Sequence, residues 1–554
     1  MTEGLVVWVM LAPLLGAVTA LLGKLLRPLQ RPLSILGTAS LAVPAVILTL
    51  LLGPVMSGES LRYALGGWPE PYGISLVLDG ISWFSCAITT VIAAAVALFS
   101  LGRRRYEAGY FFFLLIMVAG MYGVALTGDL FTLFVSFEVV AVTVYVLIAW
   151  EETDTGLAAS YKYLILSTVG ILFFLFGIFL VYRDLGVLSI SLISRALAEA
   201  GGVRNTRFMH LALAFLCGGI GVRTAFIPFH TWLPEAHAYA PHPISAMLSG
   251  AMIKVSFFAL VRVVLEFGGT YLFELLMWIG AVTALAAVLS ALAQSDVKRL
   301  LAYHSISQLG YVLAVFGAGS ALALTASFSH ALNHALFKSL LFLTVGAAVS
   351  FTGHRNIHRI PPLGRTMPLF SAAFFAGALS ISGIPPFNGF ASKGLITTGM
   401  EGSAAYPLLW VTSFLTIASF IKLSRIFLPG PRRAGTTPSS GNSNQGSVPG
   451  ILQTSVVTVL AILCLGTGMF GGSMAHGLYR IIHGTAPDAI PRLFSAKKLL
   501  GVLPAVLLGT AAFVGVSTQW GRQIAGRIRR MAPELRTVLL FFFVGLLVFA
   551  VVAY

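Results

Sequence analysis

The sequence predicts an all-α polytopic membrane protein with about 14–16 transmembrane helices. Of its 554 residues, 57% are hydrophobic and only 10% are charged, and the mean hydropathy is +0.91. A soluble domain carries about 25% charged residues. The chain also contains many apolar runs of about 20 residues, which is the length that a helix needs to cross a hydrocarbon core roughly 30 Å thick. Most of the chain is therefore expected to lie in the bilayer.

Sixteen spans are predicted when apolar runs are counted in a window of about 19 residues. Their approximate bounds are 5–23, 33–53, 76–101, 110–127, 129–150, 160–182, 211–230, 243–266, 272–293, 300–317, 321–350, 366–390, 400–428, 451–470, 499–518 and 536–553. Loops after odd-numbered spans hold about twice as many Lys and Arg residues as the other loops. The positive-inside rule therefore places these loops in the cytoplasm and the N-terminus outside.

The net charge of +16 comes from Lys and Arg in short loops, not from a polar face with interleaved aromatic residues. Membrane topology explains this charge, so no nucleic-acid partner is expected. The cysteines, Cys86, Cys217 and Cys464, each lie in an apolar run and form no C-x-x-C pair. We therefore expect no disulfide framework, no iron–sulfur site and no metal centre.

Two apolar segments are interrupted in a similar way, by RTAFIPFHTWLPEAHAYAPHP at 223–243 and by SISGIPPFNGFASKG at 380–394. Proline removes a backbone donor, and such breaks survive at bilayer depth only when they are buried in protein or line a wet cavity. Each break follows a run of about four helices, which suggests two repeats of five spans. Paired broken helices at corresponding positions indicate an ion path.

These observations divide the chain into five predicted parts. They are N-terminal transmembrane helices at 1–109, a first five-helix repeat at 110–266, a second at 272–428, a flexible linker at 429–450 and C-terminal transmembrane helices at 451–554. The linker is rich in Gly, Ser, Pro and Asn, so it cannot bury enough apolar surface to order itself. The alternative is a loop insertion without functional meaning.

Three charged residues are predicted at bilayer depth. Glu138 lies in the middle of LFTLFVSFEVVAVTVYVLIAW, Lys254 lies in ISAMLSGAMIKVSFFALVRV, and Lys393 follows the break in the twelfth span. A charge in hydrocarbon costs at least about 2.5–3.5 kcal/mol, so each is interpreted as functional. Burial favours the neutral form, which lets such a side chain load and release a proton. The alternatives are a structural ion pair for Glu138 and snorkelling to the interface for Lys254.

The eleventh span carries three titratable residues on one helical face. His330, His334 and Lys338 stand at positions i, i+4 and i+8, which places them in one line along the helix. Imidazole titrates near pH 6.5 and can both accept and donate a proton, so we expect a hydrated relay. A haem site is the alternative, and it requires a histidine from elsewhere because two histidines of one helix cannot occupy opposite axial positions.

Other polar residues have simpler explanations. One or two of the polar groups around the first break are expected to be solvated loop residues. These groups are His230, Glu235, His237 and His242. Helix capping and membrane topology account for a second set. Its members are Asp79, Asp296, Lys298 and Arg299.

Four stretches of the sequence resemble a known family. They are FIPFHTWLPEAHAYAPHPISAMLSGAMIKV, QSDVKRLLAYHSISQLGYV, LNHALFKSLLFLTVGA and ISGIPPFNGFASK. The family is that of the proton-conducting antiporter-like subunits of complex I, energy-converting membrane hydrogenases, formate hydrogenlyases and Mrp antiporters. The resemblance covers roughly residues 75–428. It implies fourteen or more helices in two inverted five-helix repeats, with helices seven and twelve broken.

The resemblance also implies roles for individual residues. Glu138 corresponds to the family's fifth-helix glutamate, Lys254 to its eighth-helix lysine and Lys393 to its twelfth-helix lysine. His334 and Lys338 match the central relay. One position departs from the family, because Arg223 stands where relatives commonly carry a lysine. Arginine is effectively always protonated, so it can bias Glu138 by charge but cannot pass a proton.

The predicted function is ion translocation, of protons and with sodium as a further candidate, by one subunit of a multi-subunit complex in the plasma membrane of a prokaryote. The resemblance implies no redox centre or other cofactor in this chain, with electron transfer left to partner subunits. It leaves the hydrogenase, quinone-reductase and Mrp branches open. A stand-alone secondary transporter and a quinone- or haem-binding membrane oxidoreductase subunit are the competing functions.

Overall fold

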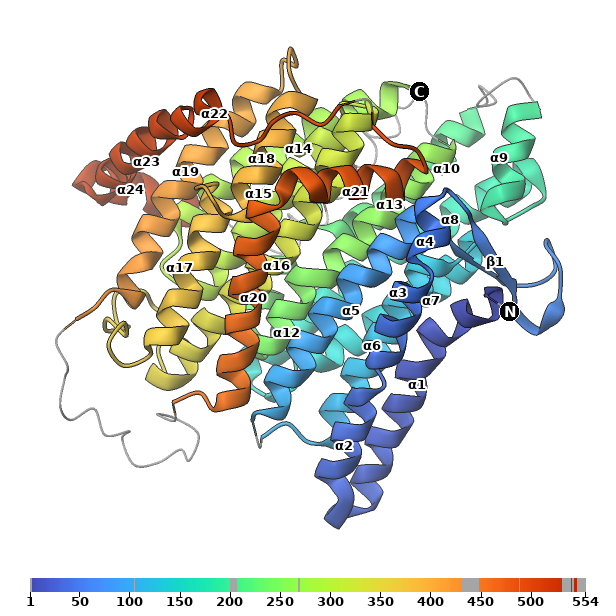
Figure 1. The fold of residues 1–554 in the computed structure, drawn as a ribbon, viewed down its shortest axis with the longest axis horizontal. Coiled ribbons are helices and arrows are strands. Elements are labelled where there is room, and N and C mark those ends of the chain that lie inside the picture. The colour runs from blue at the N-terminus through green and yellow to red at the C-terminus, as the bar shows by residue number, and fades with distance from the viewer. Residues whose placement is uncertain are drawn as a thin grey trace.

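The computed structural model describes residues 2–103, 105–199, 207–267, 270–430, 448–487 and 489–530, together with 540 and 543–545. In this part of the chain, long helices pack side by side into a bundle (Figure 1). Among the described residues, twelve helices are long and apolar enough to cross a membrane. The predicted fold class, an all-α polytopic membrane protein, is confirmed.

Four of the sixteen predicted spans are not among these twelve helices. Two of them are the broken helices, whose apolar parts, Met209–Thr224 and Pro368–Ser382, are short. A third is the helix Val297–Phe316, which carries several polar residues. The last, near 536–553, lies almost entirely outside the described residues, as does most of the predicted linker at 429–450.

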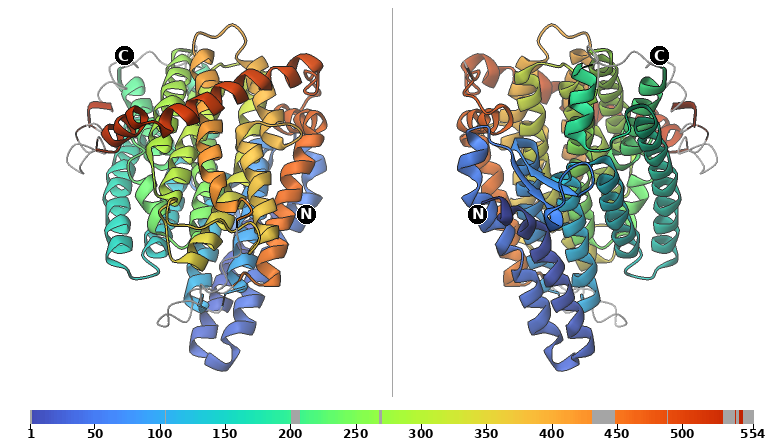
Figure 2. Two further views of the ribbon diagram at one scale, coloured as in Figure 1. Left: turned by 90° about the vertical axis from the view of Figure 1, so that its left-hand side faces the viewer. Right: turned by 90° about the vertical axis from the view of Figure 1, so that its right-hand side faces the viewer.

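The N-terminal part combines helices with a small hairpin. Its elements are α1 Glu3–Leu25, η1 Arg27–Leu29, α2 Gln30–Ala39, α3 Ala42–Leu50, α4 Leu52–Met56, β1 Leu61–Ala64, η2 Leu65–Gly67, β2 Ser75–Leu78 and α5 Gly80–Leu101. Figure 2 shows α1 and α2 extending below the rest of the bundle. The strands are antiparallel, with Leu61 opposite Leu78.

The predicted start of the third span, at residue 76, is wrong because residues 75–78 form β2. Asp79 fixes the true start of α5. Its carboxylate accepts a hydrogen bond from the backbone N–H of Ser82 at 2.8 Å, which is the N-cap interaction that begins a helix. The apolar strand and the apolar helix read as one continuous run in the sequence.

The two predicted repeats are built from elements in a similar order, with one additional short helix in the first. The first has α6 Ala108–Leu126, α7 Leu130–Ile148, α8 Asp154–Leu185, α9 Ile190–Glu199, α10 Arg207–Thr224, α11 Leu233–Tyr239, α12 His242–Met247, the π-helical turn η3 Leu248–Met252 and α13 Ile253–Phe267. The second has α14 Thr270–Ala293, α15 Val297–Phe316, α16 Ala321–Thr352, α17 Pro368–Ser382, α18 Asn388–Gly399, α19 Tyr406–Ser424 and η4 Arg425–Phe427. In each, three long helices precede a broken one, α10–α11 or α17–α18. The inverted relation between the two halves stays a prediction.

The C-terminal part packs on the outside of the bundle. Its elements are α20 Ile451–Met469, α21 Gly471–His483, α22 Ala496–Leu500, α23 Val502–Ser517 and α24 Gln519–Arg530. Helix α20 runs along the bundle, whereas α21 lies across it (Figure 1).

Side chains from the break itself and from a neighbouring helix satisfy the backbone at the first break. Trp232 donates its indole N–H to the carbonyl of Val222 at 2.7 Å, and Ile227 donates its backbone N–H to the hydroxyl of Thr283 in α14 at 3.1 Å. Backbone groups without partners are costly at bilayer depth, so contacts of this kind are what permit the break.

The second break is built in the same way. Gly383 ends α17 with φ +76°, a left-handed conformation that glycine adopts readily. The side-chain amide of Asn333 in α16 donates to the carbonyl of Asn388 at 2.9 Å. Both breaks are therefore held by residues of neighbouring helices.

Helices α14 and α15 pack with their backbones in close contact. A Cβ added to Gly310 would lie 2.4 Å from the backbone nitrogen of Ala284, and one added to Gly280 would lie 2.3 Å from that of Ala314. Small residues at helix–helix interfaces allow this approach in membranes. The contact holds α15, which carries part of the site described below.

We predict that Gly310→Ala lowers the free energy of unfolding by about 1–3 kcal/mol, because the new methyl group overpacks a backbone contact. Gly466→Ala in α20 is the matched control, since a Cβ there meets no atom within 4 Å and alanine favours a helix over glycine by about 1 kcal/mol. Detergent-induced unfolding of the two variants measures the difference. Equal stability of both would contradict the packing argument.

Candidate functional site

A series of titratable side chains lies inside the bundle. The predicted site residues are Glu138 in α7, Arg223 in α10, Lys254 in α13, His330, His334 and Lys338 in α16, and Lys393 in α18. Five of these residues are at most 2% exposed, namely Arg223, Lys254, His330, His334 and Lys338. The structure brings Glu138 and Arg223 together as one pair and the other residues together as a second group.

Glu138 and Arg223 form an ion pair. The Nη2 atom of Arg223 lies 3.1 Å from Oε1 of Glu138, and the two side chains are 3% and 40% exposed, respectively. The guanidinium also sits 4.9 Å from the centre of the Phe137 ring, a favourable cation–π position. The carboxylate therefore faces the edge of the chain while the arginine holds it from inside. This contact also meets the geometric requirement of a structural ion pair.

Lys254 directly follows the π-helical turn η3. Its ammonium group donates a hydrogen bond to the carbonyl of Ser249 within that turn, and the hydroxyl of Ser249 lies 2.7 Å from that of Ser305 in α15. Such turns are frequent at functional sites. With 1% exposure and an internal partner, Lys254 does not snorkel to the surface.

The three residues on α16 lie along one face, as their spacing predicts. Lys338 donates to the carbonyl of Leu301 in α15 at 2.5 Å. His330 contacts the hydroxyl of Ser392 at 2.9 Å and the side-chain oxygen of Gln308 at 3.1 Å. The rings of His330 and His334 are nearly parallel, with centres 6.5 Å apart.

His334 connects the members of this group electrostatically. Its ring interacts electrostatically with four neighbouring residues, Lys254, Lys338, His330 and His237. Among the described residues, neither nitrogen of its ring has a hydrogen-bond partner. His334 is therefore the central member of the second group.

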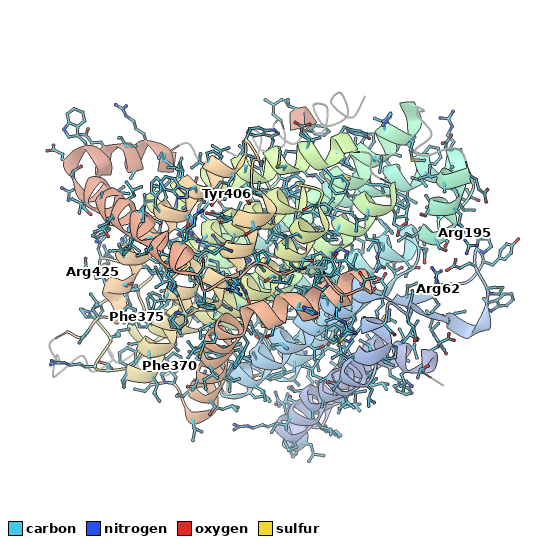
Figure 3. All side chains as sticks on the ribbon, turned by 45° about the horizontal axis from the view of Figure 1, so that its top comes forward. Arg62, Arg195, Phe370, Phe375, Tyr406 and Arg425 are labelled. Carbon is cyan, nitrogen blue, oxygen red and sulfur yellow. The ribbon has the colours of Figure 1, made fainter. Side chains whose placement is uncertain are left out.

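Lys393 ends this series at a cavity. Its ammonium donates to the carbonyl of Ile381 at 3.0 Å and to the hydroxyl of Ser413 at 3.1 Å. A cavity of about 630 Å³ lies beside it and is lined by Lys498 among other residues. Tyr406, labelled in Figure 3, begins α19 and lines the same cavity.

The geometry adds two histidines that sequence reasoning did not select. His237 in α11 and His304 in α15 are both fully buried. His237 interacts electrostatically with Lys338 and Lys254. His304 interacts in the same way with Lys338 and Lys393. His237 is therefore not a solvated loop group. A signal for His304 exists in the sequence, because His304, Gln308 and Tyr311 stand at i, i+4 and i+7 of one helix.

Lys298 also differs from its predicted role in membrane topology. It is 2% exposed, and its ammonium donates to the carbonyl of Ala240 at 2.5 Å. It thus binds the carbonyl at the end of α11, an interaction favourable for a cation at a helix C-terminus. Asp296 does cap α15, as expected, through the backbone N–H groups of Lys298 and Arg299.

The arrangement is suited to proton transfer. Lysine amines and imidazoles can each gain and lose a proton, whereas a guanidinium stays charged. Within the described ranges, no group of three or more His, Cys, Asp or Glu residues is placed to hold a metal ion. The chemistry that these side chains themselves offer is acid–base exchange along a buried line.

Comparisons with known proteins find related sequences along most of the chain. A family model described as NADH:quinone oxidoreductase/Mrp antiporter, transmembrane, matches residues 127–421. NADH-quinone oxidoreductase subunit N of Desulforudis audaxviator (strain MP104C) is 32% identical over 511 residues, covering 89% of this chain and 100% of the relative. A Na(+)/H(+) antiporter subunit of Bacillus subtilis (strain 168) is 28% identical over 468 residues, covering 83% of this chain and 92% of the relative.

Two solved structures share the fold. The Mrp complex from Dietzia sp. DQ12-45-1b contains a chain with a TM-score of 0.77 and 24% identity, and the match covers 91% of this chain and 99% of that one. The membrane-bound sulfane sulfur reductase, an archaeal respiratory membrane complex, contains one with a TM-score of 0.77 and 26% identity, again covering 91% and 99%.

We predict that the cavity beside Lys393 admits water-soluble reagents. Ser382 and Thr398 line it, so Ser382→Cys and Thr398→Cys are expected to react with a water-soluble maleimide at least about tenfold faster than a cysteine in the packed core. Ser327→Cys is the control, because Ser327 is fully buried elsewhere in the bundle. The native cysteines Cys86, Cys217 and Cys464 are all buried, which keeps the background low. Equal labelling at all three sites would contradict a wet cavity.

Proposed function

Because this chain belongs to the NADH:quinone oxidoreductase/Mrp antiporter transmembrane family, we propose that it is the ion-translocating membrane subunit of a multi-subunit complex and that protons pass along its buried residues. One observation carries the proposal. Lysines and histidines lie together in the interior, from Lys254 in α13 to Lys393 in the second broken helix. Each is a group that can both bind and release a proton.

The proposed route begins at Lys254, next to η3. From there a proton moves through Lys338 and His334 to His330, and then to Lys393. The contacts of His330 with Ser392 and Gln308 support this order, since Ser392 precedes Lys393 in α18. The cavity beside Lys393 is the outlet. His237 and His304 are proposed as further members of the relay.

Glu138 and Arg223 have a different proposed role. Arginine cannot pass a proton, so Arg223 acts on Glu138 by charge. The 40% exposure of the Glu138 side chain leaves this carboxylate accessible at the edge of the chain. In an assembled complex, a second membrane subunit packed on this edge would cover it. This placement supports a role as one subunit of an assembly more than that of a stand-alone transporter.

The ion and the location are part of the proposal. The proton is the proposed ion, because the site offers titratable groups, and sodium coupling is left as a second possibility by the relative from Bacillus subtilis, which is named a Na(+)/H(+) antiporter subunit. The chain is a multi-pass integral membrane protein, and its proposed location is the plasma membrane of a prokaryote. Electron transfer, where the complex performs it, belongs to partner subunits.

The test of the relay is Lys338→Arg in the whole complex reconstituted into proteoliposomes. We predict that proton uptake falls at least about tenfold although the charge is kept, because a relay group must be able to become neutral. Lys338→Ala is expected to fail as well. The matched control is Lys422→Arg, since Lys422 binds the carbonyls of Leu292 and Gln294 away from the relay. Normal uptake by Lys338→Arg, with assembly verified on native gels, would show that Lys338 contributes only its positive charge and does not pass a proton.

We predict that Arg223→Gln lowers proton uptake at least about tenfold, because it removes the fixed positive charge that lies 3.1 Å from Glu138 and a neutral amide cannot replace that charge. Arg223→Lys keeps the charge and should keep most of the activity. Proton uptake by the reconstituted complex, with assembly verified on native gels, measures both variants. Normal uptake by Arg223→Gln would mean that Arg223 only anchors the broken helix.

A further inference from the structure

The C-terminal helix α24 has no part in the proposed relay. Its apolar and basic residues lie on different parts of its surface. Trp520, Ile524 and Ile528 recur every four residues and share one face; Arg527 borders that face, whereas Arg522 lies on the other side of the helix. Both arginines are exposed. No Asp or Glu occurs in Gln519–Arg530. A basic amphipathic helix of this composition is typical of a membrane surface.

An apolar groove of about 390 Å³ runs under this helix. Its walls come from α14, α23 and the apolar face of α24. The lining includes Leu289, Leu292, Ala512, Val516, Trp520 and Ile524. Trp520 and Ile524 remain 78% and 57% exposed. The volume is within the range of about 300–1,000 Å³ that small-molecule sites occupy.

Helices α23 and α24 lie at the outer edge of the bundle (Figure 1). Two kinds of surface therefore meet at this edge, exposed arginines and an open apolar groove. A soluble anion would contact the arginines without filling the groove, and an uncharged lipid would fill the groove without contacting the arginines. A single ligand that uses both must carry a negative head and a hydrocarbon tail.

We propose that this groove binds an anionic phospholipid. One acyl chain lies along Leu289 and Leu292, and the phosphate is held by Arg527, because a guanidinium offers paired donors to phosphate oxygens. Arg527 stands seven residues after Trp520 and therefore on the same side of α24. Trp520 stands at the boundary between the two, where its indole suits an interface. The positive-inside rule places this end of α14 on the cytoplasmic side, and basic clusters on that side of a membrane attract anionic lipids.

The experiment titrates the delipidated full chain in detergent with phosphatidylglycerol or phosphatidylcholine and counts bound lipids by native mass spectrometry. Arg527→Gln should lose about fivefold in affinity for phosphatidylglycerol, the effect of one charge, with phosphatidylcholine unaffected. The matched control is Arg522→Gln, which removes an exposed arginine on the other side of α24 and should change neither affinity.

A second variant tests the groove itself and does not depend on the arginine variant folding. Ala512→Trp fills the groove and should weaken phosphatidylglycerol binding while both arginines remain. Soluble glycerol 1-phosphate should not compete, and effective competition would reveal a simple anion site and overturn the proposal. Unchanged phosphatidylglycerol affinity in both variants would also overturn it. So would cross-linking of Ile524→Cys to another subunit in the assembled complex, because a protein would then occupy the groove.

Discussion

Binding of buried lysine ammonium groups by main-chain carbonyl oxygens is the interaction on which the interior depends. Lys254, Lys338, Lys393 and Lys298 each donate to a carbonyl, of Ser249, Leu301, Ile381 and Ala240, respectively. A carboxylate in these positions would form an ion pair and hold the lysine in its charged form. A carbonyl stabilises the ammonium but remains compatible with a neutral amine. Three of the four carbonyls, those of Ser249, Ile381 and Ala240, lie in the π-helical turn or at the helix breaks. These irregular segments expose carbonyls that a regular helix would use internally. The carbonyl of Leu301 lies within the helix α15.

The Glu138–Arg223 pair differs from these lysine–carbonyl contacts. It joins a permanent cation to a carboxylate at 3.1 Å, so its positive partner cannot leave the charged state. The chain thus contains two kinds of buried cation, one fixed and one exchangeable. The fixed charge lies beside the carboxylate of Glu138, which faces the edge of the chain, and the exchangeable ones lie in the interior. In the proposed mechanism, this division separates the residue that biases the carboxylate from the residues that carry the proton.

Sequence reasoning located the long apolar helices, both breaks and the line of α16 residues, because each depends on local pattern. It failed where the environment of a residue depends on which helix faces pack against each other. Residues 75–78 read as part of an apolar helix, since hydropathy does not distinguish a short strand from a helix start. The burial of His237 and His304, and the partner of Lys298, depend on contacts between distant segments. The exposure of Glu138 depends on which side of α7 faces outward, and no pattern in its apolar span indicates that.

The hydrogen bond from Ile227 to Thr283 has a consequence for biogenesis. The break after α10 belongs to the first half of the chain, but the hydroxyl that satisfies it is supplied by α14 in the second half. A growing chain presents the break to the insertion machinery before Thr283 has been synthesised. In hydrocarbon, the amide of Ile227 would then lack an acceptor, which costs several kcal/mol for a backbone group. We therefore expect the first half to insert fully only after α14 has been synthesised, so that the two halves mature as one unit.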